Sequence, residues 1–93
     1  MSVDFTDRVI ADLASIDGWL TRNASPEKAE NQLARLLNRA RSLMEYPRRG
    51  PRLGAEARSM SVAETPCVLV YRVIDDGVQI LRIRHNRDDW HGA

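Results

Sequence analysis

The chain has 93 residues, a net charge of +1 and an apolar content of 43%, values that are typical of one folded domain and that exclude wholesale disorder. It has no apolar run near the roughly 20 residues needed to cross a bilayer, and its N-terminus lacks the apolar core of a signal peptide. We therefore expect a single cytoplasmic domain, residues 1–93, with no contact to a membrane. Because Cys67 is the only cysteine, an internal disulfide and a cysteine metal site are excluded, and we expect it to be a buried core residue.

The N-terminal half is predicted to form a short strand followed by two paired helices. Val3 and Phe5 alternate with polar residues, which indicates a strand at residues 1–5. Apolar residues then recur at three- and four-residue spacing, as on one face of a helix. Ser25-Pro26 is a typical start for a second helix, which we expect to end near Glu45. Residues 7–45 are therefore predicted to be an antiparallel helical hairpin.

The segment YPRRGPRLG, residues 46–54, interrupts this pattern. It contains two prolines and two glycines, which a helix does not accommodate. We expect it to be the one long connection of the domain, with its three arginines facing solvent.

Residues 55–85 are predicted to form an antiparallel meander of three strands. The run CVLVYRVI, residues 67–74, is nearly all apolar and is typical of a central strand. Asp76-Gly77 is a strong hairpin signal because the tight turn needs positive φ. The sequence thus predicts an α+β fold of order β-α-α-β-β-β, with the helical hairpin packed on a small antiparallel sheet.

The last predicted strand changes from apolar to cationic along its length. Simple alternation places Val78, Ile80, Arg82 and Arg84 on one face of this strand. It places Gln79, Leu81, Ile83 and His85 on the other face. We expect this second face to pack against the helices. The strand would then form a basic edge that continues into the tail, residues 86–93. The residues that we predict to bind a target are Arg72, Arg82, Arg84, His85, Arg87 and Trp90.

Two interpretations of this basic edge remain open at this point. Arg82 and Arg84 can pair with carboxylates of the helices or of the tail, in which case the edge is only structural. Alternatively, the arginines contact a negatively charged partner, such as nucleic acid, an enzyme that acts on nucleic acid, or an acidic peptide. The sequence shows no glycine-rich phosphate loop, no metal-ligand spacing and no nucleophile–base–acid trio, so we expect no cofactor and no metal.

The segments VLVYRVIDDGV, ILRIRH and NRDDW, in this order and behind the predicted helical hairpin, resemble the ParE toxins of the RelE/ParE superfamily of type II toxin–antitoxin systems. The resemblance covers nearly the whole chain and implies the same β-α-α-β-β-β fold. It implies a ParD-like antitoxin with a DNA-binding ribbon-helix-helix domain and a tail that wraps the toxin in a hetero-oligomer. It also implies that the free toxin inhibits DNA gyrase.

The RelE branch of the same superfamily cleaves mRNA on the ribosome, and the chain departs from its pattern. RelE-like proteins place an arginine at the start of the central strand, where this chain has Val68, and often a tyrosine in the tail, where only His91, Gly92 and Ala93 follow Trp90. Arg87 does match a basic position of that pattern. We therefore predict a toxin that acts by binding and not as an enzyme.

Two alternatives to gyrase inhibition are kept. One is a ribosome-dependent mRNA endoribonuclease, for which His85 and Arg87 would be the catalytic candidates because histidine titrates near neutral pH. The other is a non-toxic binding partner of the antitoxin that acts as a co-repressor.

Overall fold

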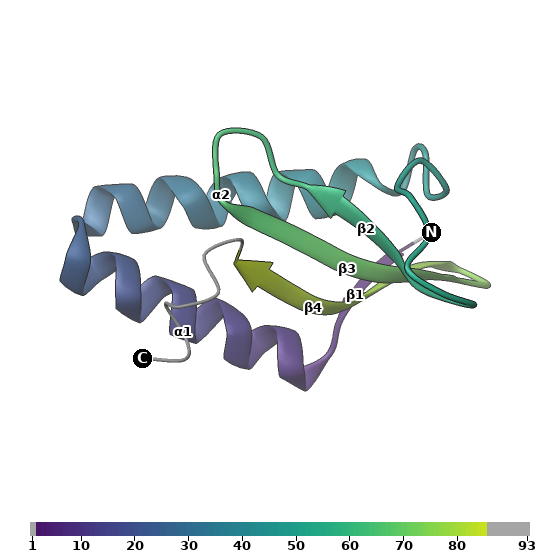
Figure 1. Ribbon diagram of the computed structural model, residues 1–93, viewed down its shortest axis with the longest axis horizontal. Helices are drawn as coiled ribbons and strands as arrows, with labels where there is room; N and C mark the ends of the chain where they lie inside the picture. Colours follow the sequence, from purple (N-terminus) through teal and green to yellow (C-terminus); the bar gives the residue numbers. More distant parts are fainter. Residues whose placement is uncertain (1, 86–93) are drawn as a thin grey trace.

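Two antiparallel helices cover one face of a four-stranded sheet in the computed structural model, which describes residues 2–85 (Figure 1). The elements in chain order are β1 (Ser2–Phe5), α1 (Asp7–Asn23), α2 (Pro26–Ser42), β2 (Arg58–Ser61), β3 (Cys67–Ile74) and β4 (Gly77–His85). The α+β class and the order of elements are as predicted. Neither helix is long and apolar enough to span a membrane within the described residues.

The sheet has the strand order β1-β4-β3-β2, so β3 is a central strand as predicted. The sheet is mixed and not purely antiparallel, because β1 pairs in parallel with β4 through Ser2 to Gly77 and Phe5 to Ile80. In the meander, β2 and β4 run in the same direction, and β1 joins the free edge of β4 in that direction too.

Local hydrogen bonds define where the helices begin and end. The Thr6 hydroxyl accepts a hydrogen bond from the Val9 amide at 3.3 Å, and the Ser25 hydroxyl accepts one from the Lys28 amide at 3.1 Å. The α2 helix ends at Ser42, short of the expected Glu45, because the next residues form tighter turns ahead of the proline at position 47.

The core lies between the helical hairpin and the covered face of the sheet. Tyr71 and Leu69 of β3 are buried against apolar residues of both helices, among them Ile16 and Leu36. Cys67 is 1% exposed, as predicted, and its burial raises the pKa of the thiol. The thiol is therefore a neutral core group at neutral pH.

A β-bulge in β4 overturns the simple alternation expected for this strand. Tyr71 of β3 pairs with Ile80, and the preceding Val70 pairs with Arg82, so Leu81 is an extra residue in β4. Because of this extra residue, each side chain of β4 after Leu81 points to the face opposite to the one that simple alternation predicts.

The bulge thereby places the arginines on the face that the helices do not cover. Ile83 and His85 are buried on the helix side, where Val78 and Ile80 also lie, while Arg84 is exposed on the other side. The expectation that Val78 and Ile80 share a face with the arginines was wrong, because alternation holds only for an uninterrupted strand.

Beyond the end of β1, helix α1 lies along the edge of β4 and binds it. The Asp12 carboxylate accepts a hydrogen bond from the Ile83 amide at 2.9 Å. It also pairs with Arg82, at 3.0 Å to Nε and 3.4 Å to Nη2. Asp12 thus satisfies a backbone group that a longer β1 would otherwise bind, and it fixes α1 against β4.

The connection between α2 and β2 is anchored to the sheet by a buried tyrosine. The Gly50 amide donates a hydrogen bond to the Tyr71 hydroxyl at 3.1 Å, and the Ser59 amide donates one to the Pro51 carbonyl at 2.9 Å. A Cβ atom at position 50 would collide with the Ser59 carbonyl, so the close approach requires glycine.

Replacing Tyr71 by phenylalanine should destabilise the protein by about 1–3 kcal/mol, because the buried Gly50 amide would lose its acceptor. Urea denaturation followed by circular dichroism measures the change. The control is Tyr46→Phe, since Tyr46 is 63% exposed and should lose almost nothing. Equal stability of the Tyr71→Phe variant and the wild type would contradict the anchoring role.

Replacing Asp12 by alanine should also cost about 1–3 kcal/mol, because the Ile83 amide and Arg82 both lose their acceptor. The matched control is Asp17→Ala on the same helix, where the side chain is exposed and makes no hydrogen bond or ion pair within residues 2–85. Thermal denaturation of both variants tests this, and a similar melting temperature for the two would argue against the clamp.

Candidate functional site

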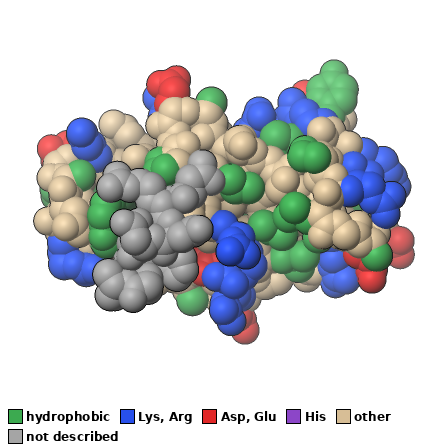
Figure 2. Space-filling model, in the orientation of Figure 1, with side chains coloured by type: hydrophobic (Ala, Val, Ile, Leu, Met, Phe, Trp, Pro, Cys, Tyr) green, Lys and Arg blue, Asp and Glu red, His purple; other side chains and the backbone are tan. Residues whose placement is uncertain are grey.

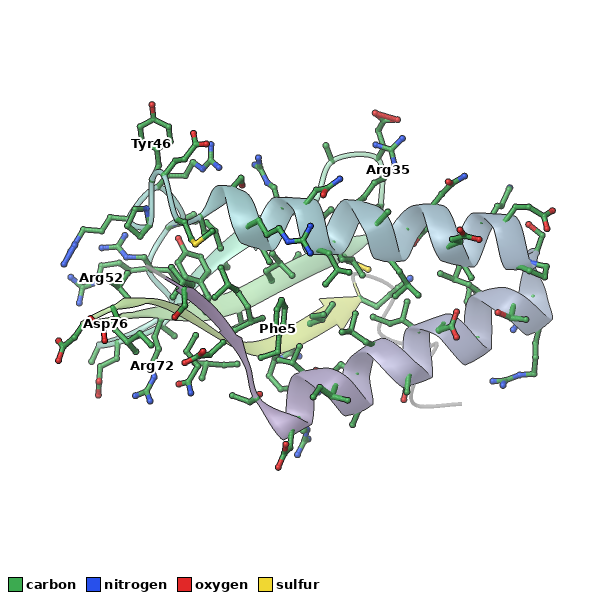
Figure 3. The ribbon with its side chains drawn as sticks, turned by 180° about the vertical axis from the view of Figure 1, so that it is seen from behind. Phe5, Arg35, Tyr46, Arg52, Arg72 and Asp76 are labelled. Carbon is green, nitrogen blue, oxygen red and sulfur yellow. The ribbon has the colours of Figure 1, made fainter. Side chains whose placement is uncertain are left out.

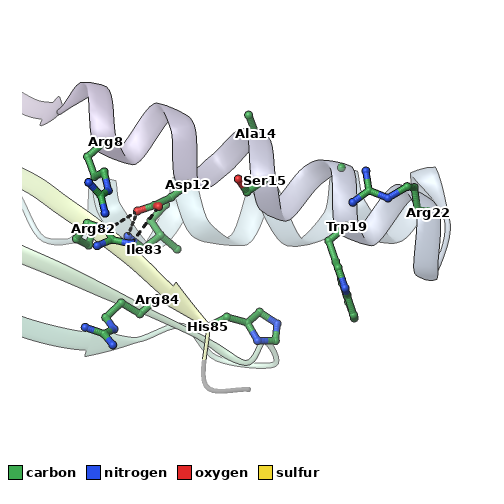
Figure 4. A pocket seen from close by; sticks show the side chains of 11 residues that line it. Arg8, Asp12, Ala14, Ser15, Trp19, Arg22, Arg82, Ile83, Arg84 and His85 are labelled. Atoms are coloured by element: carbon green, nitrogen blue, oxygen red, sulfur yellow. Dashed lines mark hydrogen bonds and ion pairs between the residues drawn. The ribbon is translucent and has the colours of Figure 1, made fainter. Parts of the chain in front are cut away.

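A cleft of about 710 Å³ lies between α1 and the C-terminal end of β4 (Figure 4). We call it the α1–β4 cleft. The residues that line it are Arg8, Asp12, Ala14, Ser15, Gly18, Trp19 and Arg22 of α1 and Arg82, Ile83, Arg84 and His85 of β4. Two other hollows of the described residues, of about 270 and 290 Å³, are smaller.

Four arginines and one carboxylate line this cleft. Arg82 forms an ion pair with Asp12 of α1. For this residue, the interpretation in which the arginine pairs with a helix carboxylate is therefore confirmed. Arg8, Arg22 and Arg84 are exposed, and none of the three forms a hydrogen bond or ion pair with another of residues 2–85. Among residues 2–85, the cleft therefore has an excess of positive charge that is not neutralised.

Helix α1 contributes Arg8 and Arg22, which we did not predict to belong to a site. They lie on the same side of the helix as Asp12 and Trp19, at three- and four-residue spacing along α1. This polar stripe is visible in the sequence. What the sequence does not show is that the stripe faces the arginines of β4.

His85 forms part of the wall at the end of the cleft. Its side chain is mostly buried, with a residue exposure of 8%, and its ring lies 6.1 Å from the ring of Trp19 at an angle of 57°. Packing of this kind holds the end of β4 against α1. His85, which we predicted to bind a target and kept as a catalytic candidate, is thus held in place by an aromatic neighbour.

The structure brings together only some of the residues predicted to bind a target. Arg82, Arg84 and His85 line the α1–β4 cleft. Arg72 lies elsewhere, near the hairpin turn at the opposite end of β3, where its Nε donates to Gln79 Oε1 at 2.7 Å. Arg87 and Trp90 lie outside the described residues.

The uncovered face of the sheet continues from the cleft. Val68 and Val70 of β3 and Leu81 of β4 are half-buried on the sheet, and Arg84 pairs across the strands with Val68. Figure 2 views the molecule from this side and shows hydrophobic and basic side chains interspersed on the surface. An apolar strip beside unpaired guanidinium groups suits a partner that is itself apolar and acidic.

In chemical terms, the cleft is equipped to bind anions. A guanidinium group offers a planar set of donors that matches phosphate or carboxylate oxygens, often in pairs. Three such groups around one hollow can contact several anionic groups of a macromolecule at once.

Comparison with known proteins agrees with this architecture. Residues 3–90 match the family model of the ParE toxin of the type II toxin–antitoxin system parDE. Toxin RelE2 of Caulobacter vibrioides is 41% identical over 83 residues, which is 89% of this chain and 92% of that protein. Toxin RelE3 of the same organism is 34% identical over 87 residues, covering 91% and 94% of the two chains.

A solved structure described as the chromosomal ParDE toxin–antitoxin system from P. aeruginosa shares the fold, with a TM-score of 0.82 and 26% identity. The match covers 91% of this chain and 95% of that one. A family model that matches nearly the whole length, two relatives above 30% identity and a common fold lead to one conclusion. The chain belongs to the ParE toxin family of type II toxin–antitoxin systems.

Proposed function

We propose that the free protein arrests growth by binding DNA gyrase, without chemistry of its own, and that a ParD-like ribbon-helix-helix antitoxin neutralises it. The observation that carries the proposal is the α1–β4 cleft, where Arg8, Arg22 and Arg84 are exposed and unpaired within residues 2–85. Such a surface suits contact with a macromolecule that bears negative charge.

We propose that the antitoxin binds the face of the sheet that the helices do not cover. Val68, Val70 and Leu81 leave apolar surface there that the helices do not cover. An antitoxin tail with apolar and acidic side chains can bury these residues and reach the arginines of the cleft. Neutralisation then follows because the antitoxin and the target compete for the same positive charge.

Position 68 supports binding over catalysis. Val68 pairs with Arg84 across β3 and β4, so an arginine at position 68 would lie directly beside Arg84 on the same face. This chain has a valine there, and the local positive charge that would stabilise a cleaved phosphate is lower.

An mRNA endoribonuclease is the alternative, and the names of the two curated relatives favour it. Both are called RelE toxins. In that case the catalytic candidates are His85, at the end of β4, and Arg87, which lies outside the described residues.

The charge of the cleft is tested by the double variant Arg22→Glu with Arg84→Glu. We expect it to abolish growth arrest, because two of the three unpaired cations become anions. Arg82 is left unchanged, since its replacement would break the contact with Asp12 and disturb the fold. Growth is measured after induction without the antitoxin.

The matched control is Lys28→Glu with Arg41→Glu on α2, which changes the net charge by the same amount away from the cleft. The control should remain toxic. Toxicity that survives in the cleft variant, with an unchanged circular dichroism spectrum, would show that the cleft is not the working surface.

The target is decided by two assays on the same preparation. We expect the purified toxin to inhibit supercoiling by purified gyrase and to induce DNA breaks in cells. Full supercoiling at high toxin excess would rule out gyrase inhibition, and cleaved transcripts in primer extension of translated messages would assign the protein to the nuclease alternative. Harmless expression without any antitoxin would indicate a co-repressor.

A further inference from the structure

A second group of arginines lies at the opposite end of the sheet from the α1–β4 cleft. A shallow hollow of about 270 Å³ is lined there by Arg48 and Arg52 of the α2–β2 connection, Arg58 at the start of β2 and Arg72 of β3, together with Ala55, Glu56, Ala57 and Val73. We call it the arginine hollow. Figure 3 shows the Arg52 and Arg72 side chains at this end of the molecule. The function proposed above makes no use of it.

The charge of the arginine hollow is largely unneutralised. Glu56 is the one carboxylate among its lining residues. Within residues 2–85 the ion pairs are Arg82 with Asp12 and Arg35 with Glu64, so none of the four arginines of the hollow is paired. Asp76 lies at the same end of the molecule in Figure 3 but does not line the hollow.

Three of these guanidinium groups are held in place by neutral acceptors. Arg58 Nη1 donates to the carbonyls of Arg48 at 3.1 Å and Gly50 at 2.9 Å, and Arg52 Nη2 donates to the carbonyl of Ala55 at 2.7 Å. Arg72 is held by the side-chain amide oxygen of Gln79. Such bonds orient the cations without cancelling their charge, so less entropy is lost when an anion binds.

The same connection exposes an aromatic ring beside a cation. Tyr46 is 63% exposed, and the Arg49 guanidinium lies 5.7 Å from the centre of its ring. The connection is not a loose loop, because the Gly50 amide is bound to the buried Tyr71 hydroxyl. It therefore presents fixed cations, and the exposed ring of Tyr46 lies outside the hollow at the same end of the molecule (Figure 3).

We propose that the arginine hollow and Tyr46 form a nucleic-acid-binding surface that is separate from the α1–β4 cleft. Arginine contacts to phosphate oxygens make up much of a typical protein–nucleic acid interface, and exposed aromatic rings stack on unpaired bases. An acidic protein partner is less well matched, because the centre of a protein interface is usually an apolar anchor, whereas guanidinium groups dominate this hollow.

The test is fluorescence anisotropy of the full chain with a labelled oligonucleotide, over a series of salt concentrations. Single-stranded DNA, single-stranded RNA and duplex DNA of one sequence distinguish which polymer is bound. We expect affinity to fall steeply with salt, and the double variant Arg48→Ala with Arg52→Ala to reduce the slope of log affinity against log salt by about 2. Tyr46→Ala should weaken single-stranded binding about tenfold and leave duplex binding nearly unchanged.

The matched control is Lys28→Ala with Arg41→Ala on α2, which removes the same charge from residues that line neither the arginine hollow nor the α1–β4 cleft and should leave the slope unchanged. Arg58 is not substituted, because it ties the connection together through two carbonyls. Folding of each variant is checked by its melting temperature.

Three results would overturn the proposal. One is the absence of salt-dependent binding to all three oligonucleotides, and another is an unchanged slope in the Arg48→Ala, Arg52→Ala variant. The third is equal competition by polyglutamate, which would assign the hollow to an acidic protein. Because none of these readouts uses gyrase or growth, failure here leaves the proposed function of the α1–β4 cleft to be judged by its own assays.

Discussion

The contact of Asp12 with β4 is the interaction on which the arrangement of the site depends. Strand β1 is short, so it leaves the last part of β4 without a strand neighbour on that edge. Asp12 supplies the missing acceptor to the Ile83 amide and binds Arg82 at the same time. Helix α1 is thereby held along the sheet edge, and the space between them becomes the α1–β4 cleft. A carboxylate that completes a sheet edge thus also sets the wall of the candidate site.

This arrangement separates two kinds of arginine. Arg82 is a structural residue whose charge is matched, while Arg84, two residues further along, is exposed and has no ionic partner among residues 2–85. In the arginine hollow, Arg58 is structural in another way, because it binds two neutral carbonyls of the α2–β2 connection and keeps its charge, while Arg48 is exposed. Arginine content alone therefore says little about function. What matters is which guanidinium groups already have an anionic partner.

The two basic surfaces lie at opposite ends of a sheet whose uncovered face is partly apolar. A toxin of this family has to be held by an antitoxin and also act on a target, and these tasks place different demands on a surface. Reversible wrapping by an antitoxin favours an apolar strip with charged borders, whereas action on nucleic acid or on an enzyme that binds it favours clustered cations. Val68 and Val70 provide the strip, and the arginines on either side provide the cations.

The sequence alone determined the elements and much of the core. Helix caps at Thr6 and Ser25, the hairpin at Gly77 and the burial of Cys67 all follow from short-range chemistry, so local patterns predict them. The resemblance of the ordered motifs was sufficient to indicate the family. Only the tertiary structure decided which residues form the site. The bulge at Leu81 exchanged the faces of β4, and the packing of α1 placed Arg8 and Arg22 on the same cleft as Arg84 and paired Arg82 with Asp12. The bulge depends on the pairing of β4 with β3, and the position of α1 depends on contacts between residues 70 and 75 positions apart, neither of which the spacing of residues along one segment encodes.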